Sequence, residues 1–206
     1  MWKTLLDLIF PINCLGCGQP GNFICFNCFE KIPLNTKPIL NNLLIASYYK
    51  NPLVKQLIHS YKYDFVKDLA KPLGQLMVKK LAQQNIKNPV LIPVPLHAKR
   101  LRWRGFNQSE ELALVISQKL NIPVINNVLI RTKHTSPQAK IENLKQRKIN
   151  IKNSFQININ FKKSLKNKNI ILIDDISTTG ATIEECAKTL KPLKPKTVYG
   201  LVIAKG

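Results

Sequence analysis

The stretch IILIDDISTTGAT, residues 170–182, decides the fold of this chain. Residues 170–173 are apolar on both faces, which predicts a short buried strand of a parallel sheet. The loop 176–182 is rich in hydroxyl groups and contains a glycine, and a helix predicted over 181–191 follows it. The stretch is therefore predicted to be a strand–loop–helix unit whose loop presents backbone N–H groups at the start of the helix.

The loop 176–182 has the chemistry of a sugar-phosphate site. Its N–H groups and the helix dipole favour an anion, and hydroxyl donors are available from Thr178, Thr179 and Thr182. Asp174 and Asp175 precede the loop, where the hydroxyls of an attached ribose would lie. The loop is not a P-loop, since it lacks the G-x-x-x-x-G-K-[ST] pattern and any lysine. An ordinary β–α turn would not explain two adjacent acids at the end of a buried strand.

Length and composition limit the remaining possibilities. The chain has 206 residues, of which 45% are hydrophobic, enough for one medium-sized domain with a small appendage. No apolar run approaches the roughly 20 residues that cross a bilayer. Residues 1–10 resemble a signal peptide only superficially, because Asp7 interrupts the apolar part and no cleavage site of small residues follows. We expect a short amphipathic helix there, with contact to a membrane surface as an alternative, and a cytoplasmic protein.

The chain is strongly basic. Its 32 Lys and Arg residues against 11 acids give a net charge of +21, although a composition rich in Lys, Asn and Ile suggests an AT-rich genome that raises the lysine count without a functional cause. Arginines gather where planar guanidinium groups suit phosphate recognition. They are Arg100, Arg102, Arg104, Arg131 and Arg147. The pattern predicts polyanion binding and leaves open whether the anion is a nucleic acid or a phosphorylated small molecule.

Four cysteines lie close together near the amino end, as Cys14-x-x-Cys17 and Cys25-x-x-Cys28. This spacing is typical of a structural zinc site with four thiolate ligands and no open coordination position. Disulfides and a redox pair are the alternatives, but a reducing cytoplasm disfavours the first and no thioredoxin-like context supports the second. We predict that Zn²⁺ folds this segment and that the fifth cysteine, Cys186, belongs to the core.

The rest of the chain alternates between strand and helix patterns. Predicted strands span 43–49, 89–95, 128–131, 170–174 and 198–204. Predicted helices span 52–61, 65–83, 108–119, 137–148 and 181–191. A Lys- and Asn-rich segment, 158–169, is predicted to be a surface connection or hairpin. The alternation predicts an α/β fold with a mostly parallel sheet, helices on both faces, and ligands at the carboxyl ends of its strands.

A basic segment follows the predicted strand 89–95. Because Arg100, Arg102 and Arg104 are spaced by two, an extended loop would point all three side chains in one direction. Such a row could grip pyrophosphate or a nucleic-acid backbone, while Trp103 or Phe106 stacks on a base. The alternative is an exposed basic loop in which Trp103 covers the core.

A second polar loop begins at Arg131, runs through Lys133 and His134, and enters a helix. His134 could assist at a phosphate site, although a single loop histidine is more often only solvated. His59 and His97 have no partner cluster, so they are not predicted as metal ligands or bases.

Five motifs occur in order along the chain. They are the two Cys-x-x-Cys pairs, P-V-P-L-H-x-x-R-x-x-x-R-G-F-N-Q at 93–108, R-x-K-x-T-x-x-Q at 131–138, R-x-x-N at 147–150 and D-D-I-x-T-T-G-A-T at 174–182. The last resembles the signature for 5-phosphoribosyl-1-pyrophosphate (PRPP) of the type I phosphoribosyltransferases. The ordered set resembles the competence protein F family over nearly the whole chain. Lys133 stands where that family usually has arginine.

The resemblance implies a type I phosphoribosyltransferase fold over 39–206, preceded by a zinc-finger segment over 1–38. It also implies a role in natural transformation, in which the protein handles incoming single-stranded DNA on the cytoplasmic side. The cytoplasmic face of the inner membrane is then a candidate location. A DNA helicase or another protein of the competence machinery is a candidate partner.

The resemblance implies roles for individual residues. Asp174 and Asp175 would meet the ribose hydroxyls of PRPP, directly or through Mg²⁺. Six residues would hold the 5-phosphate: Ser177, Thr178, Thr179, Gly180, Ala181 and Thr182. Eight would bind pyrophosphate or DNA: Val94, Leu96, Arg100, Arg102, Trp103, Arg104, Arg131 and Lys133. Residues 131–138 would belong to the loop that closes over PRPP.

Three functions are compatible with these motifs. The first is a protein that handles single-stranded DNA and keeps a PRPP site. The second is an active nucleobase phosphoribosyltransferase that uses PRPP and Mg²⁺. The third is an adaptor that binds PRPP and recruits a protein partner through the zinc segment. No base-binding hood is recognisable, and the zinc segment together with residues 43–61 occupies the amino end, where such enzymes often carry one.

Overall fold

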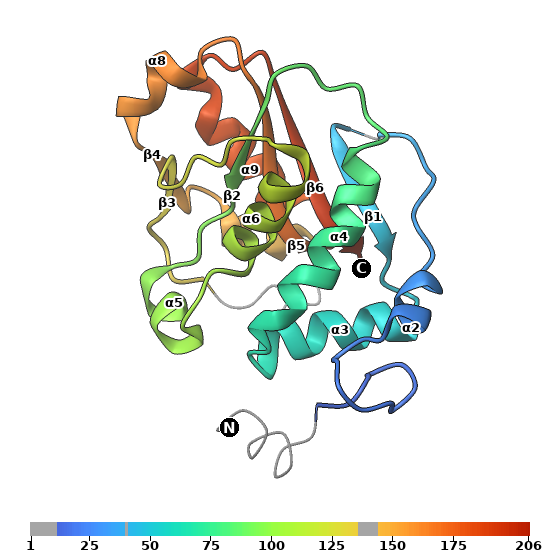
Figure 1. Cartoon of the computed structure of the whole chain (residues 1–206). Helices are drawn as coiled ribbons and strands as arrows, with labels where there is room; N and C mark the ends of the chain where they lie inside the picture. Colours follow the sequence, from blue (N-terminus) through green and yellow to red (C-terminus); the bar gives the residue numbers. More distant parts are fainter. Residues whose placement is uncertain (1–11, 40, 136–143) are drawn as a thin grey trace, which may run out of the picture.

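A four-stranded parallel sheet forms the centre of the molecule (Figure 1). The computed structural model describes residues 12–39, 41–135 and 144–206. In spatial order the strands are β1 (Leu43–Tyr48), β6 (Thr197–Lys205), β5 (Asn169–Ser177) and β2 (Pro89–Pro93). The pairings between them are all parallel, so the expected mostly parallel α/β sheet is confirmed.

Helices and a small second sheet surround this centre. The helices are α2 (Phe26–Glu30), α3 (Pro52–Tyr63), α4 (Ala70–Leu81), α5 (Ala98–Arg104), α6 (Gln108–Leu120), α7 (Leu144–Ile151), α8 (Lys162–Leu165) and α9 (Ala181–Leu190). The 3₁₀ turns are η1 (Lys67–Leu69), η3 (Ile159–Phe161) and η4 (Lys191–Leu193). The second sheet pairs β3 (Leu129–Arg131) with β4 (Phe155–Ile157) in antiparallel fashion. Within the described ranges, no helix has the length and apolar character to cross a membrane.

Both faces of the central sheet are covered because its strands are apolar on both faces. α4 and α6 pack on one face, and α9 packs on the other (Figure 1). Along β5, Ile171 and Ile173 enter the core beneath α4 and α6, whereas Ile170 and Leu172 enter the core beneath α9. Since side chains alternate along a strand, one apolar run fills two cores and fixes β5 in the middle of the fold.

Most predicted elements form, with differences at their ends. The predicted strand 170–174 is too short, because Ser177 is still paired with β6. The predicted helix 65–83 is wrong at its start, where Phe65 has a φ of +56° and η1 precedes α4. The segment 158–169 contains η3 and α8 in place of a hairpin. The predicted helix at 1–10 and the first part of the one at 137–148 lie outside the described residues.

The cysteine segment packs directly on the α/β body. Phe29 and Ile32 are buried in the same cluster as the residues of β1 and α4. The connection that follows is fixed by Lys80, whose ammonium donates hydrogen bonds of 2.7 Å to the main-chain oxygens of Asn35 and Lys37. The division of the chain at residues 38 and 39 stays a prediction.

Candidate functional site

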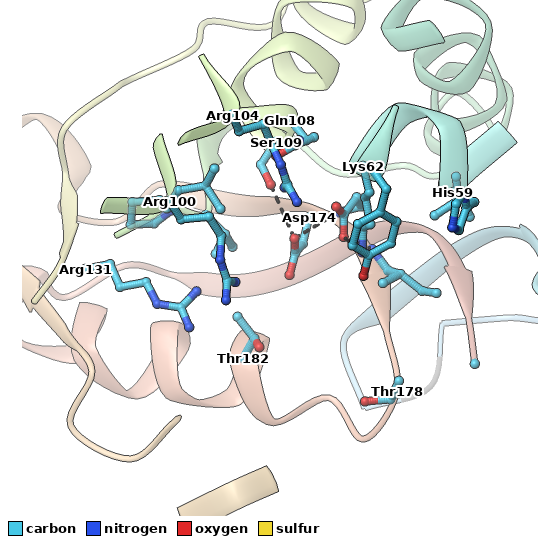
Figure 2. A pocket seen from close by; sticks show the side chains of 18 of the residues that line it. His59, Lys62, Arg100, Arg104, Gln108, Ser109, Arg131, Asp174, Thr178 and Thr182 are labelled. Carbon is cyan, nitrogen blue, oxygen red and sulfur yellow. Dashed lines mark hydrogen bonds and ion pairs between the residues drawn. The ribbon is translucent and has the colours of Figure 1, made fainter. Parts of the chain in front are cut away.

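A cavity of about 780 Å³ lies at the carboxyl ends of β2 and β5. Its floor contains the acid pair and part of the loop after β5, and its walls come from α3, α5 and the start of α6 (Figure 2). This is the edge of a parallel α/β sheet at which ligands bind, as the sequence predicts.

The acid pair lies near the carboxyl end of β5 and makes four close contacts. Ser109 Oγ donates to Asp174 Oδ1 at 3.3 Å, and the backbone N–H of Asp175 donates to the same oxygen at 2.9 Å. Asp175 Oδ1 accepts from the Ile176 N–H at 2.6 Å and lies 2.8 Å from Lys62 Nζ. Burial and then the neighbouring Asp175 charge raise the pKa of Asp174 to about 7, although Lys62 opposes the shift. Two carboxylates are thus held at the floor by donors from three elements.

The loop between β5 and α9 turns sharply at Gly180, whose φ of +84° is a left-handed conformation that favours glycine. This residue caps α9, and the hydroxyl of Thr179 accepts a hydrogen bond from the Ala181 N–H at 3.2 Å. Thr178 and Thr182 line the cavity with their side chains. Ser177 and Ala181 are buried in the protein, so of these two only the backbone is suited to contact a ligand.

The basic segment is a helix, so the prediction of an extended row of arginines is wrong. α5 begins at a cap in which His97 Nδ1 accepts from the Lys99 N–H at 3.2 Å, and it ends at Gly105 with a φ of +80°. Between these caps the residues are mostly good helix formers, which overrides the spacing of two. Arg100 and Arg104, one turn apart, line the cavity, whereas Arg102 does not.

The aromatic residues of this segment have different environments. The ring of Phe106 packs 5.7 Å from that of Tyr61 against the core, which favours Trp103 over Phe106 as the ring available to a base. Trp103 is 63% exposed at the cavity, with its ring 4.9 Å from that of Phe65 in an edge-on arrangement. Trp103 therefore does not cover the core.

Arg131 enters the cavity from β3 beside Arg100. The Arg131 guanidinium donates to Thr135 Oγ1 at 2.6 Å, and that of Arg100 donates to the Thr135 main-chain oxygen at 3.3 Å. Burial, followed by the charge of Arg100, lowers the pKa of Arg131. Figure 2 shows Arg100, Arg131 and Thr182 on one side of Asp174 and Lys62 on the other. The cavity therefore has a cationic side at its β3 and α5 end.

The other residues predicted to bind pyrophosphate or DNA differ in whether they line the cavity. Val94 and Leu96 line the cavity, and their contact with pyrophosphate stays a prediction. Lys133 does not line it, and its ammonium donates to the Lys152 main-chain oxygen at 3.2 Å on the surface. The part of the predicted closing loop beyond Thr135, with Gln138, lies outside the described residues.

Several polar atoms around the cavity are buried without a partner among the described residues. They are Arg104 Nε, both amide atoms of Gln108, Arg131 Nε and Thr178 Oγ1. Buried polar groups are normally hydrogen-bonded, so such a concentration marks a place built for a polar ligand. The arginines and hydroxyls suit phosphate oxygens, and the carboxylate oxygens of Asp174 and Asp175 are ligands of the kind that Mg²⁺ prefers.

Sequence reasoning missed the wall made by α3. His59, Lys62 and Tyr63 of this helix line the cavity, and so does Ser109 at the start of α6. None belongs to a motif that predicts a ligand. Lys62 follows the buried Tyr61 and lies one turn after Ile58, a pattern that indicates only a helix with one buried face.

The four cysteines near the amino end form one cluster. Their sulfur atoms all lie within 4.8 Å of one another, close enough to hold a single metal ion. Gly16 lies against this cluster, and a larger residue would not fit there because its Cβ would lie only 2.8 Å from Cys28 Sγ. Burial raises the pKa of the Cys14 thiol, but hydrogen bonds from the N–H groups of Cys25, Gly16 and Cys17 outweigh burial and lower this pKa to about 6. The side-chain hydrogen bond with Cys25, together with burial, raises the pKa of Cys28 to about 12. Four thiolates this close require a cation, and an all-sulfur tetrahedral set suits Zn²⁺.

The chain is similar to known proteins over most of its length. The phosphoribosyl transferase domain family matches residues 66–205. The chain is 31% identical to competence protein F of Haemophilus influenzae over 192 residues, 89% of this chain and 80% of that protein. It is 28% identical to the DNA utilization protein YhgH of Escherichia coli over 185 residues, which cover 86% of this chain and 77% of that protein. It is 32% identical to competence protein ComFC of Bacillus subtilis over 199 residues, which cover 91% of this chain and 75% of that protein. The chain therefore belongs to the competence protein F family, with a phosphoribosyltransferase domain and a four-cysteine cluster consistent with a zinc finger.

Proposed function

We propose that this protein binds PRPP in the cavity and handles single-stranded DNA in natural transformation. One observation carries the PRPP site: a single cavity joins the acid pair, the start of α9 and the guanidinium groups of Arg100, Arg104 and Arg131. Unpartnered buried donors surround the same cavity. An anion with a phosphate at one end, a pyrophosphate at the other and hydroxyls between them would satisfy all of these groups.

Each part of PRPP has a proposed partner. The N–H groups and hydroxyls of the loop 177–182 bind the 5-phosphate, as helix starts favour anions. Asp174 and Asp175 accept hydrogen bonds from the ribose hydroxyls. Arg100 and Arg131 hold the pyrophosphate by charge-assisted hydrogen bonds. Mg²⁺ bound together with PRPP supplies further neutralisation of the pyrophosphate charge.

The DNA-handling part rests on charge and on relatives. A net charge of +21 is far beyond what solubility needs, and Arg102 and Trp103 are exposed on α5, the helix that forms one wall of the cavity. Cations and aromatic rings together are the usual platform for single strands. The names of the relatives, competence protein F and DNA utilization protein, point to the same role. We further propose a cytoplasmic location, at the inner face of the membrane, and a helicase or other competence protein as the partner.

The test is a titration of labelled single-stranded DNA with the zinc-loaded protein, at two salt concentrations, with and without Mg²⁺ and PRPP. Binding of PRPP is measured in parallel by calorimetry. We expect salt-sensitive DNA binding that PRPP alters, and loss of PRPP binding in the Asp174→Asn, Asp175→Asn double variant. If the protein binds DNA no more tightly than an unrelated protein of equal charge, the DNA-handling part of the proposal is wrong. If the wild type does not bind PRPP, the PRPP-binding part is wrong.

A second candidate function is nucleobase phosphoribosyl transfer. It is favoured by Tyr63 and Trp103, which line the same cavity and are 45% and 63% exposed, so that their rings are available to a base beside the ribose site. Arginines and Mg²⁺ would then stabilise the departing pyrophosphate while the acids orient the ribose. The test is PRPP-dependent release of pyrophosphate with a panel of bases. Release that the Asp174→Asn, Asp175→Asn variant loses supports transfer, and no release with any base rules it out.

A further inference from the structure

Lys62 brings a positive charge into the acid pair from a helix outside the matched domain. α3 precedes residues 66–205, which match the phosphoribosyl transferase domain. Lys62 Nζ lies 2.8 Å from Asp175 Oδ1, and the two side chains are only 16% and 12% exposed. The contact is therefore a largely buried ion pair inside the cavity and differs from the exposed pairs that contribute little.

The position of Lys62 is fixed by the packing of α3. Tyr61 is fully buried, and its hydroxyl donates a 2.9 Å hydrogen bond to the main-chain oxygen of Gln108. Ile58, one turn before Lys62, is also buried, and the side chain of Asn51 caps the first turn by accepting from the Val54 N–H. The packing and the cap of α3 therefore hold the Lys62 ammonium beside Asp175.

The other cations of the cavity make no ion pair with the acid pair among the described residues, although Arg104 lies near enough to interact with the charge of Asp175. Figure 2 shows Lys62 across Asp174 from Arg100 and Arg131. These two guanidinium groups share Thr135 as their hydrogen-bond partner. Among the ion pairs of the described residues, the only one that involves the acid pair is that of Lys62 with Asp175. Lys62 therefore occupies one carboxylate oxygen of Asp175 and neutralises negative charge that would attract a divalent ion.

We propose that Lys62 is the resident counter-ion of Asp175 and keeps a divalent metal ion off the acid pair until PRPP brings the metal with it. A metal ion binding alone would have to displace the ammonium from Asp175. PRPP offers ribose hydroxyls to Asp175 and anionic oxygens to the released ammonium, so the displacement is compensated only when PRPP is present. The identity of the ligand rests on the proposed function, whereas the exclusion of the metal rests on the ion pair.

The test measures Mn²⁺ binding, by electron paramagnetic resonance, to zinc-loaded protein without PRPP. Lys62→Met should bind Mn²⁺ at least about tenfold more tightly than the wild type, because the carboxylate is no longer neutralised. Lys62→Arg keeps the charge and should bind Mn²⁺ as weakly as the wild type. Lys55→Met, which removes an exposed charge from the same helix, should change nothing. Addition of Asp175→Asn to Lys62→Met should abolish the gain.

Equal Mn²⁺ affinity of Lys62→Met and the wild type would overturn the proposal. If Lys62→Met is too unstable to purify, Lys62→Gln, which keeps a polar end, gives the same comparison. PRPP binding with Mg²⁺ is measured on the same samples. PRPP binding by the wild type without a gain of Mn²⁺ affinity in the variant overturns the counter-ion role alone. A gain of Mn²⁺ affinity without PRPP binding supports that role and contradicts the proposed function.

Discussion

The hydroxyl of Tyr61 donates a 2.9 Å hydrogen bond to the main-chain oxygen of Gln108, and this buried contact joins two walls of the cavity. Tyr61 directly precedes Lys62, which pairs with Asp175. Gln108 directly precedes Ser109, whose hydroxyl donates to Asp174. One hydrogen bond between residues 47 positions apart therefore holds together the two helix ends that contact the acid pair.

Removal of this hydroxyl should destabilise the protein. Tyr61→Phe keeps the ring and leaves the buried oxygen of Gln108 without this donor, so the free energy of unfolding should fall by about 1–2 kcal/mol. Urea denaturation followed by circular dichroism measures it. Tyr63→Phe, on the same helix but 45% exposed, is the matched control and should change little. Equal stability of the two variants would show that the hydrogen bond is not important.

The helical form of α5 predicts different roles for its arginines. Arg100→Ala and Arg104→Ala should each weaken PRPP binding by about tenfold or more, since both line the cavity and charge-assisted hydrogen bonds are strong. Arg102→Ala should leave PRPP affinity unchanged but reduce the salt slope of DNA binding by roughly 0.7 for each phosphate that the variant no longer neutralises. Calorimetry and DNA titrations measure the two effects. An equal decrease of PRPP affinity in all three variants would favour an extended row over the helix.

The cysteine cluster should contain zinc. Protein purified without oxygen should carry about one zinc ion per chain, and Cys14→Ser with Cys17→Ser should lose it. Chelation should first increase hydrogen exchange in residues 12–32, because metal binding and local folding are coupled. Cys186→Ala, which changes a buried cysteine outside the cluster, should keep the metal. A metal content near zero in the wild type would refute the prediction.

The raised pKa of Asp174 predicts how stability changes with pH. The pKa of this group rises from 3.8 to about 7 on folding, so between these values the folded state binds more protons than the unfolded state. The contribution of Asp174 to stability is therefore full below pH 3.8 and is lost as the pH rises towards 7. Asp174→Asn cannot ionise and so avoids this loss; it should be more stable than the wild type at pH 8, by up to about 4 kcal/mol.

Denaturation from pH 4 to pH 8 without added Mg²⁺ tests the prediction for Asp174. The stability difference between variant and wild type should shrink as the pH falls. The control is Asp68→Asn, which removes one carboxylate from the 3₁₀ turn η1, away from the cavity. A difference that is constant with pH would mean that Asp174 titrates normally.

Contiguous sequence was enough to predict the floor of the site. The strand, the acid pair and the helix start occupy residues 170–182, so their geometry depends mainly on local backbone preferences and on burial of an apolar run. The cysteine spacing similarly predicts a compact cluster, because each pair is separated by two residues. The ordered motifs placed the chain in its family without any tertiary information.

The sequence at the two ends of α5 indicates a helix. His97 supplies a capping acceptor and Gly105 a left-handed terminus, and the residues between them are mostly good helix formers. The spacing of the arginines by two is compatible with an extended segment as well, and it does not distinguish the two conformations. The difference matters because a helix turns Arg102 away from the cavity that Arg100 and Arg104 line.

Short runs of residues were enough to predict the loop between β5 and α9 and the four-cysteine cluster, and the alternation of strand and helix patterns along the chain was enough to predict the parallel α/β class. Only the tertiary structure brought Lys62 to Asp175 and Ser109 to Asp174, and only it joined Arg100 and Arg131 at Thr135. Ser109 and Asp174 are 65 positions apart, and Arg100 and Thr135 are 35 positions apart. Long-range contacts of this kind follow from how α3, α5 and α6 pack around the sheet, and apolar packing leaves no periodic signal for the polar residue at the end of a helix.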